Sequence, residues 1–215
     1  MLKINIKASH ITSLTDARYF AAKDVEWLSF NFIENDASYI DPMVARAMFE
    51  WVSVPTIVGE FDHNTAEEIN FYGHNWGLKA IQVGFFTPLS IVKDIKSIPV
   101  IKEFRIEEFT NPDYLRAELL AFSPYVQAFQ LNFDKNGITW DDLKKPSSML
   151  TVEDLKSLCG DFNIILSIDF EPFMLDEIYE LKLYGLNVKG SAEERIGVKS
   201  FDSMDEIFDA LEIFS

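Results

Sequence analysis

The chain has 215 residues, of which 48% are hydrophobic, and its 35 acidic and 19 basic residues give a formal net charge of −16. This charge argues against nucleic acid and anionic membrane as partners, because binding either relies on lysine and arginine at phosphate groups. The single cysteine, Cys159, excludes an internal disulfide and a cysteine-based zinc site. No apolar run approaches the roughly 18 residues that span a bilayer, and we expect a cytoplasmic protein.

Short runs rich in β-branched and aromatic residues recur along the chain and predict strands. They cover residues 2–8, 27–32, 55–61, 78–83, 99–106, 126–132, 163–169 and 186–190. Stretches with apolar residues at helical spacing predict helices between them, at residues 15–22, 41–52, 64–73, 87–97, 111–122, 151–160, 171–185 and 201–214. Alternating strands and helices predict an α/β fold, a single (β/α)₈ TIM barrel over residues 1–215. An open doubly wound sheet is the alternative.

In such a barrel, functional residues lie on the loops that follow the strands, at the carboxyl ends of the strands. Polar and aromatic residues stand at most of these positions in the sequence. The strand ends carry Lys7, Ser9 and His10, then Ser38, then Glu60, Asp62 and His63, then Gln82, Phe85 and Phe86, then Arg105, Asn132, Ser167, Asp169, Gly190 and Ser191.

The opening of the chain reads KASHITSLTDARYFAAKDVEWLSFNF. This stretch resembles the opening of phosphoribosylanthranilate isomerases, which have a strand ending Lys-x-Cys-Gly-Ile-Thr followed by a helix with Asp-Ala. The resemblance extends to the end of the chain through SYIDPMVARAMFEWV, TIVGEF, IQV, VIKEFRI and GLNVKGSAEERIGVKSFD. It implies a barrel of the ribulose-phosphate-binding type and an aldose–ketose isomerase that performs an Amadori rearrangement in tryptophan biosynthesis.

The two catalytic positions implied by the resemblance carry different residues here. The family's cysteine, which removes a proton from C2′ of the substrate, falls on Ser9, and the glycine after it falls on His10. The aspartic acid that protonates the ribose ring oxygen falls on Asn132. A serine hydroxyl is a poor base unless a neighbour activates it, and an amide does not deliver an acid proton at neutral pH.

The substrate-binding positions implied by the resemblance have also changed. The arginine that holds the anthranilate carboxylate falls on Ser38, and the phosphate loop after the seventh strand falls on residues 167–170, which place the Asp169 carboxylate where glycines are expected. Gly190 and Ser191 keep the capacity to bind a phosphate. The remaining residues that we predict at the substrate are Lys7, Glu60, Gln82, Arg105 and Ser167.

His10 has two interpretations. It could form a rebuilt acid–base site with Asp169, Glu60 and Asn132, because histidine titrates near neutral pH. Alternatively, it is a strand-end residue that points away from Ser9 and hydrogen-bonds to backbone.

The carboxylates at the mouth also have two interpretations. Glu60 and Asp62 could bind a divalent metal with His63 or His10, but this pattern is weak, and we predict neither metal nor cofactor. We expect instead that Glu60 and Asp169 pair with Lys7 and Lys102 inside the mouth, because buried charges require partners.

Two further features have simpler interpretations. We expect Cys159 to be a packed helix residue. Phe85 and Phe86 either close an apolar lid over the mouth or pack within their own loop.

Three functional hypotheses follow. The leading one is a diverged homologue that has lost the isomerase activity and binds or acts on another small ligand, with a phosphosugar as one candidate, as a monomer or homodimer. The second is an authentic isomerase that uses Ser9 and His10 in place of the thiol, and Asp134 or Asp169 in place of Asn132. The third is a non-catalytic scaffold, which a mouth plugged by the protein's own side chains would favour.

Overall fold

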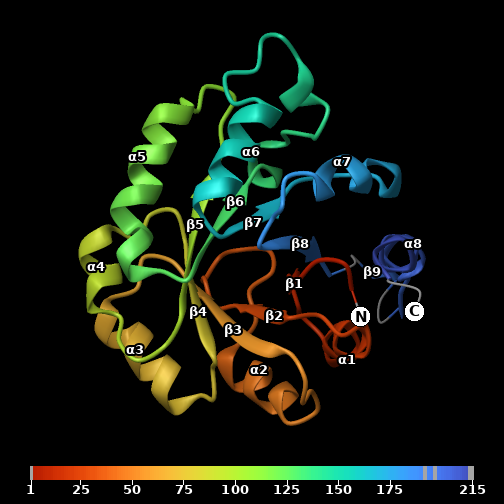
Figure 1. Cartoon of the computed structure of the whole chain (residues 1–215). Helices are drawn as coiled ribbons and strands as arrows, with labels where there is room; N and C mark the ends of the chain where they lie inside the picture. The colour runs from red at the N-terminus through yellow and green to blue at the C-terminus, as the bar shows by residue number, and fades with distance from the viewer. Residues whose placement is uncertain (1, 191–192, 196–197, 213–215) are drawn as a thin grey trace.

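Eight parallel strands pair in chain order and close into a barrel in the computed structural model, which describes residues 2–190, 193–195 and 198–212 (Figure 1). The strands are β1 (Ile6–Ser9), β2 (Trp27–Asn31), β3 (Thr56–Phe61), β4 (Ala80–Val83), β5 (Val100–Arg105), β6 (Ala128–Asn132), β7 (Ile164–Ser167) and β8 (Gly185–Lys189). Because β1 pairs with both β2 and β8, the sheet has no open edge. The predicted (β/α)₈ barrel is confirmed, and the open doubly wound sheet is wrong.

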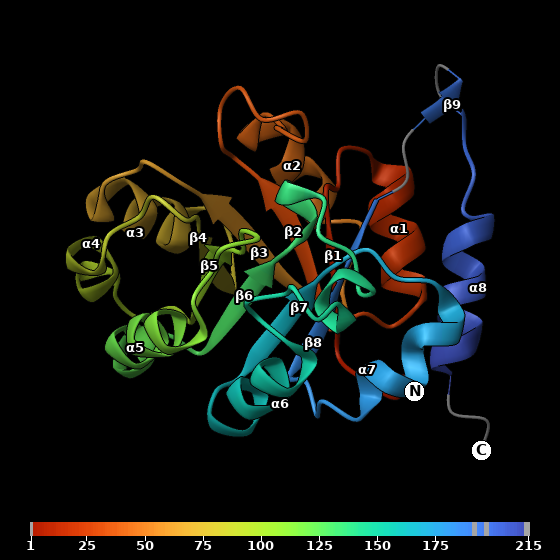
Figure 2. The same cartoon turned by 90° about the horizontal axis from the view of Figure 1, so that it is seen from above.

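The helices surround the strands, as the view from above shows (Figure 2). They are α1 (Leu14–Ala22), α2 (Pro42–Phe49), α3 (Ala66–Asn75), α4 (Leu89–Asp94), α5 (Pro112–Phe122), α6 (Val152–Asp161), α7 (Leu175–Tyr179) and α8 (Asp202–Leu211). Shorter 3₁₀ turns occupy Ser123–Tyr125, Asp134–Asn136, Asp142–Lys144 and Pro172–Met174, and a small antiparallel pair is formed by β9 (Glu193–Arg195) and β10 (Val198–Lys199).

Local sequence explains where several helices begin. The side chains of Ser13, Asp41, Thr65, Asn111 and Thr151 each accept a hydrogen bond from a backbone N–H in the first turn of the helix that follows. At Thr65 and Thr151, the carboxylate three positions later accepts a hydrogen bond from the backbone N–H of the cap residue, which completes a capping box.

The helices predicted at residues 87–97 and 171–185 differ most from the observed ones, and backbone conformation explains both differences. The helix predicted at residues 87–97 ends at Asp94, because Ile95 is extended and Ser97 has a positive φ of 63°. The stretch at residues 171–185 is split into a 3₁₀ turn and α7, and Lys182, with φ of 56°, lies in the left-handed region just beyond it.

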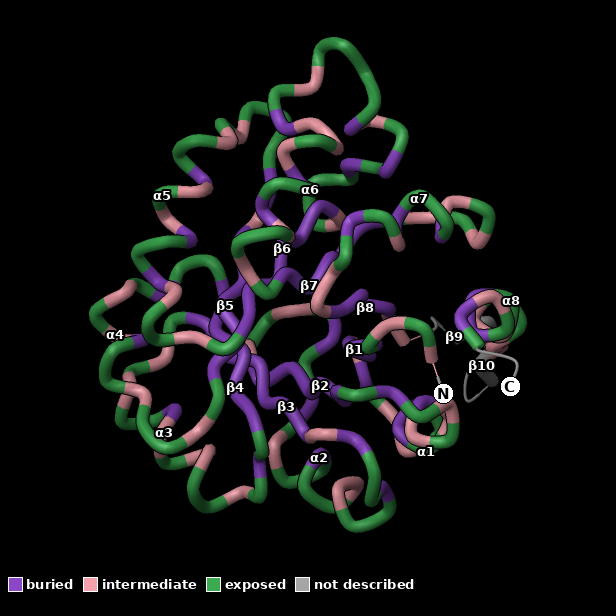
Figure 3. Tube along the Cα trace, viewed as in Figure 1, coloured by how far each residue is buried: buried purple, intermediate pink, exposed green. Residues whose placement is uncertain are grey.

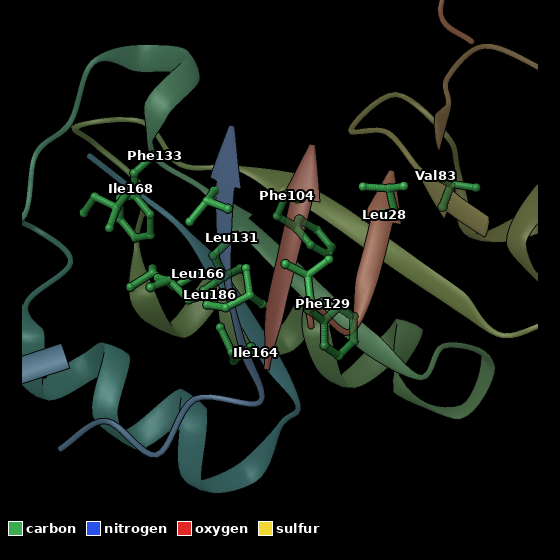
Figure 4. Packing of buried hydrophobic residues seen from close by; sticks show 14 of the residues in the cluster. Leu28, Val83, Phe104, Phe129, Leu131, Phe133, Ile164, Leu166, Ile168 and Leu186 are labelled. Carbon is green, nitrogen blue, oxygen red and sulfur yellow. The ribbon is translucent and has the colours of Figure 1, made fainter. Parts of the chain in front are cut away.

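The apolar core has two parts. The larger part fills the space between the outer faces of the strands and the helices, where Leu28, Phe104 and Leu166 lie (Figure 4), and Cys159 packs against it as predicted. The smaller part closes the amino-terminal end of the barrel interior. It consists of Trp27, Val58, Ala80, Ile101, Ala128 and Ile165. The strands are therefore buried on both faces, while the helices expose their outer sides (Figure 3).

The carboxyl ends of the strands, opposite this apolar plug, are where side chains from all eight strands converge. Among the described residues, no helix combines the length and the apolar character needed to cross a membrane.

Candidate functional site

A layer of polar side chains lies inside the barrel directly above the apolar plug. Side chains two positions apart on a strand point to the same side, so residues that follow the plug at this spacing also face inward. Val58 is followed in this way by Glu60, and Ile101 by Glu103. The buried members of this polar interior are Lys7, Ser9, Ser29, Asn31, Glu60, Gln82, Glu103, Gln130, Asn132, Ser167 and Asn187.

Lys7 and Glu60 form the ion pair at the centre of this interior. Lys7 Nζ lies 2.7 Å from Glu60 Oε1, and the two side chains are 0% and 10% exposed. Ser29 Oγ donates a second hydrogen bond to the same oxygen at 2.5 Å. Burial alone would raise the pKa of Glu60, but the ammonium of Lys7 and the hydroxyl of Ser29 outweigh it and hold this pKa below its usual value. The predicted pairing of Lys7 with Glu60 is thus confirmed.

Asn187 connects this pair to the position of the family's catalytic cysteine. Its Nδ2 donates to Ser9 Oγ and to Ser167 Oγ, both at 3.1 Å, and its Oδ1 accepts from Lys7 Nζ at 3.4 Å. The hydroxyl of Ser9 donates in turn to the backbone carbonyl of Val188 at 3.3 Å. The proton of Ser9 is therefore directed at a carbonyl, and among the described residues no imidazole or carboxylate contacts this hydroxyl.

Asp134 occupies the corner of the mouth between the ends of β6, β7 and β8. Its Oδ2 accepts a hydrogen bond from Ser167 Oγ at 2.7 Å and lies 3.1 Å from Lys189 Nζ. The side chain of Asp134 is 8% exposed. The resemblance implies a bound phosphate beside the loops that follow β7 and β8, and here a carboxylate of the chain itself neutralises the lysine in that corner.

Asn132, at the position of the family's general acid, is buried on β6, next to the strand that carries Glu103. Its Oδ1 accepts from the backbone N–H of Lys135 at 3.2 Å. Glu103 accepts from the amides of Gln82 and Gln130 at 3.1 and 3.2 Å, and Lys135 Nζ lies 3.6 Å from its other oxygen. Gln82 and Asn132 are therefore brought to the mouth as predicted by their place on the strands, and both are engaged by neighbours.

Ser38 lies at the mouth between two hydrogen-bonded neighbours, Asn31 and Asp36. It accepts from Asn31 Nδ2 at 2.8 Å and donates to Asp36 Oδ1 at 2.8 Å. Burial would raise the pKa of Asp36, but hydrogen bonds from the backbone and side chain of Ser38 outweigh it, and this pKa falls below its usual value. The position where the resemblance implies an arginine thus presents a carboxylate and a hydroxyl.

His10 adopts a left-handed backbone conformation, with φ of 59°. The family has glycine at this position, and the backbone keeps the conformation that glycine adopts most easily. Gly190 packs directly against it: a Cβ on Gly190 would lie 2.8 Å from the carbonyl oxygen of His10. Burial lowers the pKa of His10. The predicted hydrogen bond from its ring to backbone is wrong, because the ring forms none with the described residues.

Asp169 and Lys102 do not lie where the ion-pair interpretation requires them. Asp169 follows the last residue of β7, is exposed, and forms no ion pair within the described part of the chain. Lys102 faces the helices, because its neighbours on β5 face the barrel interior. The expected pairing of Asp169 and Lys102 inside the mouth is therefore wrong. Ser191 lies outside the described residues.

Phe85 and Phe86 border one side of the mouth. The ring of Phe86 stacks on His63, with 4.9 Å between the ring centres, and the guanidinium of Arg105 lies 5.2 Å from the centre of the Phe86 ring. Phe85 meets Phe86 edge to face. These contacts are with the loops after β3 and β4 and with the end of β5, so the two rings pack among neighbouring strand ends.

Sequence reasoning missed Asn187 and Glu103, which organise the two halves of the polar interior. Both are signalled by strand parity, because Asn187 lies two residues before Lys189 and Glu103 two residues before Arg105. Among the described residues, no group of three histidine, cysteine, aspartate or glutamate side chains is arranged to hold a metal ion.

No protein-family model and no curated protein matches this sequence. The structure is nevertheless similar to solved phosphoribosylanthranilate isomerases. The enzyme from Thermus thermophilus is 26% identical, with a TM-score of 0.75 over 97% of this chain and 98% of that one. Monomers of the dimeric enzyme from Thermotoga maritima are 19% identical, with a TM-score of 0.75 and the same coverage of 97% and 98%.

A third similar structure contains a ligand. It is a phosphoribosylanthranilate isomerase in complex with reduced 1-(o-carboxyphenylamino)-1-deoxyribulose 5-phosphate, 21% identical, with a TM-score of 0.75 over 97% of this chain and 98% of that one. The resemblance stated from the sequence is confirmed: the chain has the fold of phosphoribosylanthranilate isomerases over nearly its whole length.

Proposed function

We propose that this chain is a diverged relative of phosphoribosylanthranilate isomerase that does not catalyse the Amadori rearrangement, and that it binds or acts on another small ligand at the carboxyl ends of the barrel strands. The observation that carries the proposal is the Asp134 carboxylate, held by Ser167 and Lys189. A substrate phosphate at that corner would meet a negative charge, and Lys189 would have to exchange its internal partner for the ligand.

The chemistry of Ser9 and Asn132 supports the same proposal. The rearrangement needs one group that gives a proton and another that takes one. Ser9 donates to a carbonyl, and Asn132 is an amide that accepts from backbone, so neither is prepared for proton transfer. His10 is the titratable side chain nearest in sequence, and it forms no hydrogen bond with Ser9 among the described residues.

Two alternatives remain distinct from this proposal. An authentic isomerase would use Asp134 or Asp169 as the acid, but Asp134 is engaged by two donors and Asp169 is exposed to solvent. A non-catalytic scaffold is favoured by the internal network, in which the side chains of Lys7, Asn187 and Asp134 are all engaged by neighbouring side chains. The Nε of Arg105 favours a ligand over a scaffold, because this buried donor has no hydrogen-bond partner among the described residues.

The setting of the activity is part of the proposal. The ligand of one similar structure is a phosphosugar derivative, and we keep a phosphosugar as one candidate for this chain. We propose a monomer or homodimer that acts in the cytoplasm, without nucleic acid or membrane as a partner.

A series of variants tests the proposal. We compare the wild type with Ser9→Cys/Asn132→Asp/Ser38→Arg, and with the same triple variant carrying Asp134→Gly. We expect no turnover of phosphoribosylanthranilate by the wild type, and measurable turnover first in the quadruple variant, because only there is the phosphate corner cleared. Rescue of a tryptophan auxotroph that lacks the isomerase by the wild-type chain would contradict the proposal.

A further inference from the structure

A groove of about 730 Å³ lies outside the barrel, between α5 and the loops that follow β4 and β5. Figures 1 and 2 place α4 and α5 side by side, with the loop after β4 leading into α4. The volume falls in the range of about 300 to 1,000 Å³ that is typical of small-molecule sites. Aromatic rings dominate the lining: Phe85, Phe86, Phe104, Phe109, Tyr114 and Phe122.

Lys102 lies at the inner wall of this groove and forms no ion pair with any carboxylate of the described residues. It is 1% exposed, and its ammonium donates to the backbone carbonyls of Gly84, Phe85 and Thr87 at 2.5, 3.1 and 3.0 Å. These bonds use all three of its N–H donors and supply only partial negative charge. The ammonium also lies 5.3 Å from the ring centres of Phe104 and Phe122, which line the groove.

Arg105 adds a second cation to the same groove. Its guanidinium lies over the ring of Phe86, 5.2 Å from the ring centre, and its buried Nε has no hydrogen-bond partner in the part of the chain that the structure describes. Within the described part of the chain Arg105 forms no ion pair. A guanidinium that is stacked on a ring and still has free donors is prepared to bind a carboxylate.

Among the described residues, no acidic side chain forms an ion pair with these two cations. Burial lowers the pKa of Lys102 to about 8, and the more distant carboxylates of Asp62, Glu103 and Glu118 act in the opposite direction. Glu107 and Glu118 also line it, but neither lies within ion-pair distance of Lys102 or Arg105. Glu103 is engaged by Gln82, Gln130 and Lys135 inside the barrel. Asp62 accepts from Thr87.

Cations without ion-pair partners are notable in a chain whose acidic residues outnumber its basic residues. The chain has 35 acidic and 19 basic residues, yet two neighbouring cations that form no ion pair with the described carboxylates share one apolar groove. We infer that this groove binds a small organic anion with an apolar body and one acidic head, an alkyl or aryl carboxylate, whose head meets Arg105 and whose body lies against the rings. Lys102 then contributes its field rather than a direct bond, because its donors are occupied.

The inference rests on the proposed function only in placing ligand binding at this end of the barrel. The groove shares Arg105 with the predicted substrate residues, but it uses none of the residues at positions 9, 38, 132 or 134, on which the isomerase test depends. Isomerase turnover by the wild type would overturn the proposed function and leave the groove's ligand untouched. Failure to bind a carboxylate would overturn the groove's ligand and leave the loss of isomerase activity standing.

The test is calorimetric titration of the full chain with 2-naphthoate and with octanoate, beside 2-naphthylmethanol as an uncharged analogue. We expect saturable binding of the carboxylates at one site and at least about tenfold weaker binding of the alcohol, because a charge-assisted hydrogen bond is lost. Arg105→Gln should weaken the binding of 2-naphthoate by a similar factor.

A matched pair of variants on α5 shows where the ligand lies. Ala121→Trp places a large ring in the groove and should abolish binding, while Ala117→Trp, an exposed position on the same helix that does not line the groove, should bind like the wild type. Circular dichroism and thermal melting check that both variants are folded.

Three results would overturn the inference. One is the absence of saturable carboxylate binding up to about 1 mM, the upper end of common enzyme–ligand affinities. The second is equal affinity for the acid and the alcohol. The third is unchanged naphthoate binding in folded Ala121→Trp.

Discussion

Replacing Glu60 with glutamine tests how strongly the buried ion pair holds the barrel together. Lys7 is 0% exposed and lies 2.7 Å from Glu60, so the substitution leaves an ammonium in the interior without a counter-charge. At this distance two unit charges interact with about 6 kcal/mol at an effective dielectric constant of 20, and desolvation offsets part of this. Removing one partner of a buried pair costs about 3 to 5 kcal/mol.

We expect Glu60→Gln to lower the free energy of unfolding by about 3 kcal/mol at pH 7, at the lower end of that range, because the amide oxygen still accepts a hydrogen bond from Lys7. Urea denaturation followed by circular dichroism measures this change. The double variant Lys7→Met/Glu60→Gln should be more stable than Glu60→Gln alone, because it no longer buries an unpaired charge. A loss below about 0.5 kcal/mol in the single variant would refute the reasoning, since surface substitutions change stability by this much.

The remaining predictions concern pH, backbone strain and capping. The pKa of Glu60 is lower in the folded state than in the unfolded chain. The stability that ionised Glu60 contributes should therefore be fully present above the unfolded pKa of about 4.3 and be lost as pH falls through the folded pKa. Urea midpoints measured across acid pH should show this loss, and Glu60→Gln should reduce it. His10→Gly should raise the free energy of unfolding by about 1 kcal/mol, because φ of 59° strains a residue with a Cβ, whereas an unchanged or lower value would show that the imidazole packing matters more. Thr151→Ala should cost about 1 kcal/mol by removing the cap of α6, as thermal melting can measure. Thr12→Ala, at an exposed position that caps no helix, should cost less.

The barrel itself follows from local sequence. Runs such as residues 55–61 and 126–132 alternate with amphipathic stretches headed by capping residues, and parallel strands joined by helices allow few arrangements. Helix lengths were less predictable, because residues such as Ser97 and Lys182 adopt positive φ without being glycine. Residue type does not indicate a left-handed backbone conformation at these positions.

The polar interior was predictable only in part. Strand parity indicates that Glu60 and Lys7 face one another, and the structure agrees. The same parity places the side chain of Lys102 on the outer face of β5, away from the mouth. The predicted ion pair between Asp169 and Lys102 took account of charge but not of this direction. Asp169 follows the end of β7, beyond the last residue whose direction the strand determines.

The contacts of Asp134 could not be predicted from the sequence, because they depend on tertiary structure. It lies in a 3₁₀ turn after β6, and its partners Ser167 and Lys189 come from the next two strands. The sequence offers it as a candidate acid, but only the packing of three strand ends shows that its carboxylate fills the corner.

The central claim is that the chain has kept the isomerase fold and lost the isomerase reaction. Direct turnover of phosphoribosylanthranilate by the purified wild-type chain tests this claim, with the structurally similar Thermus thermophilus enzyme as the positive control. We predict no conversion above the uncatalysed background at any pH between about 5 and 8, the range in which a histidine such as His10 changes charge. Conversion by the wild type that is lost in Asp134→Asn would contradict the account, because Asp134 would then be a working acid.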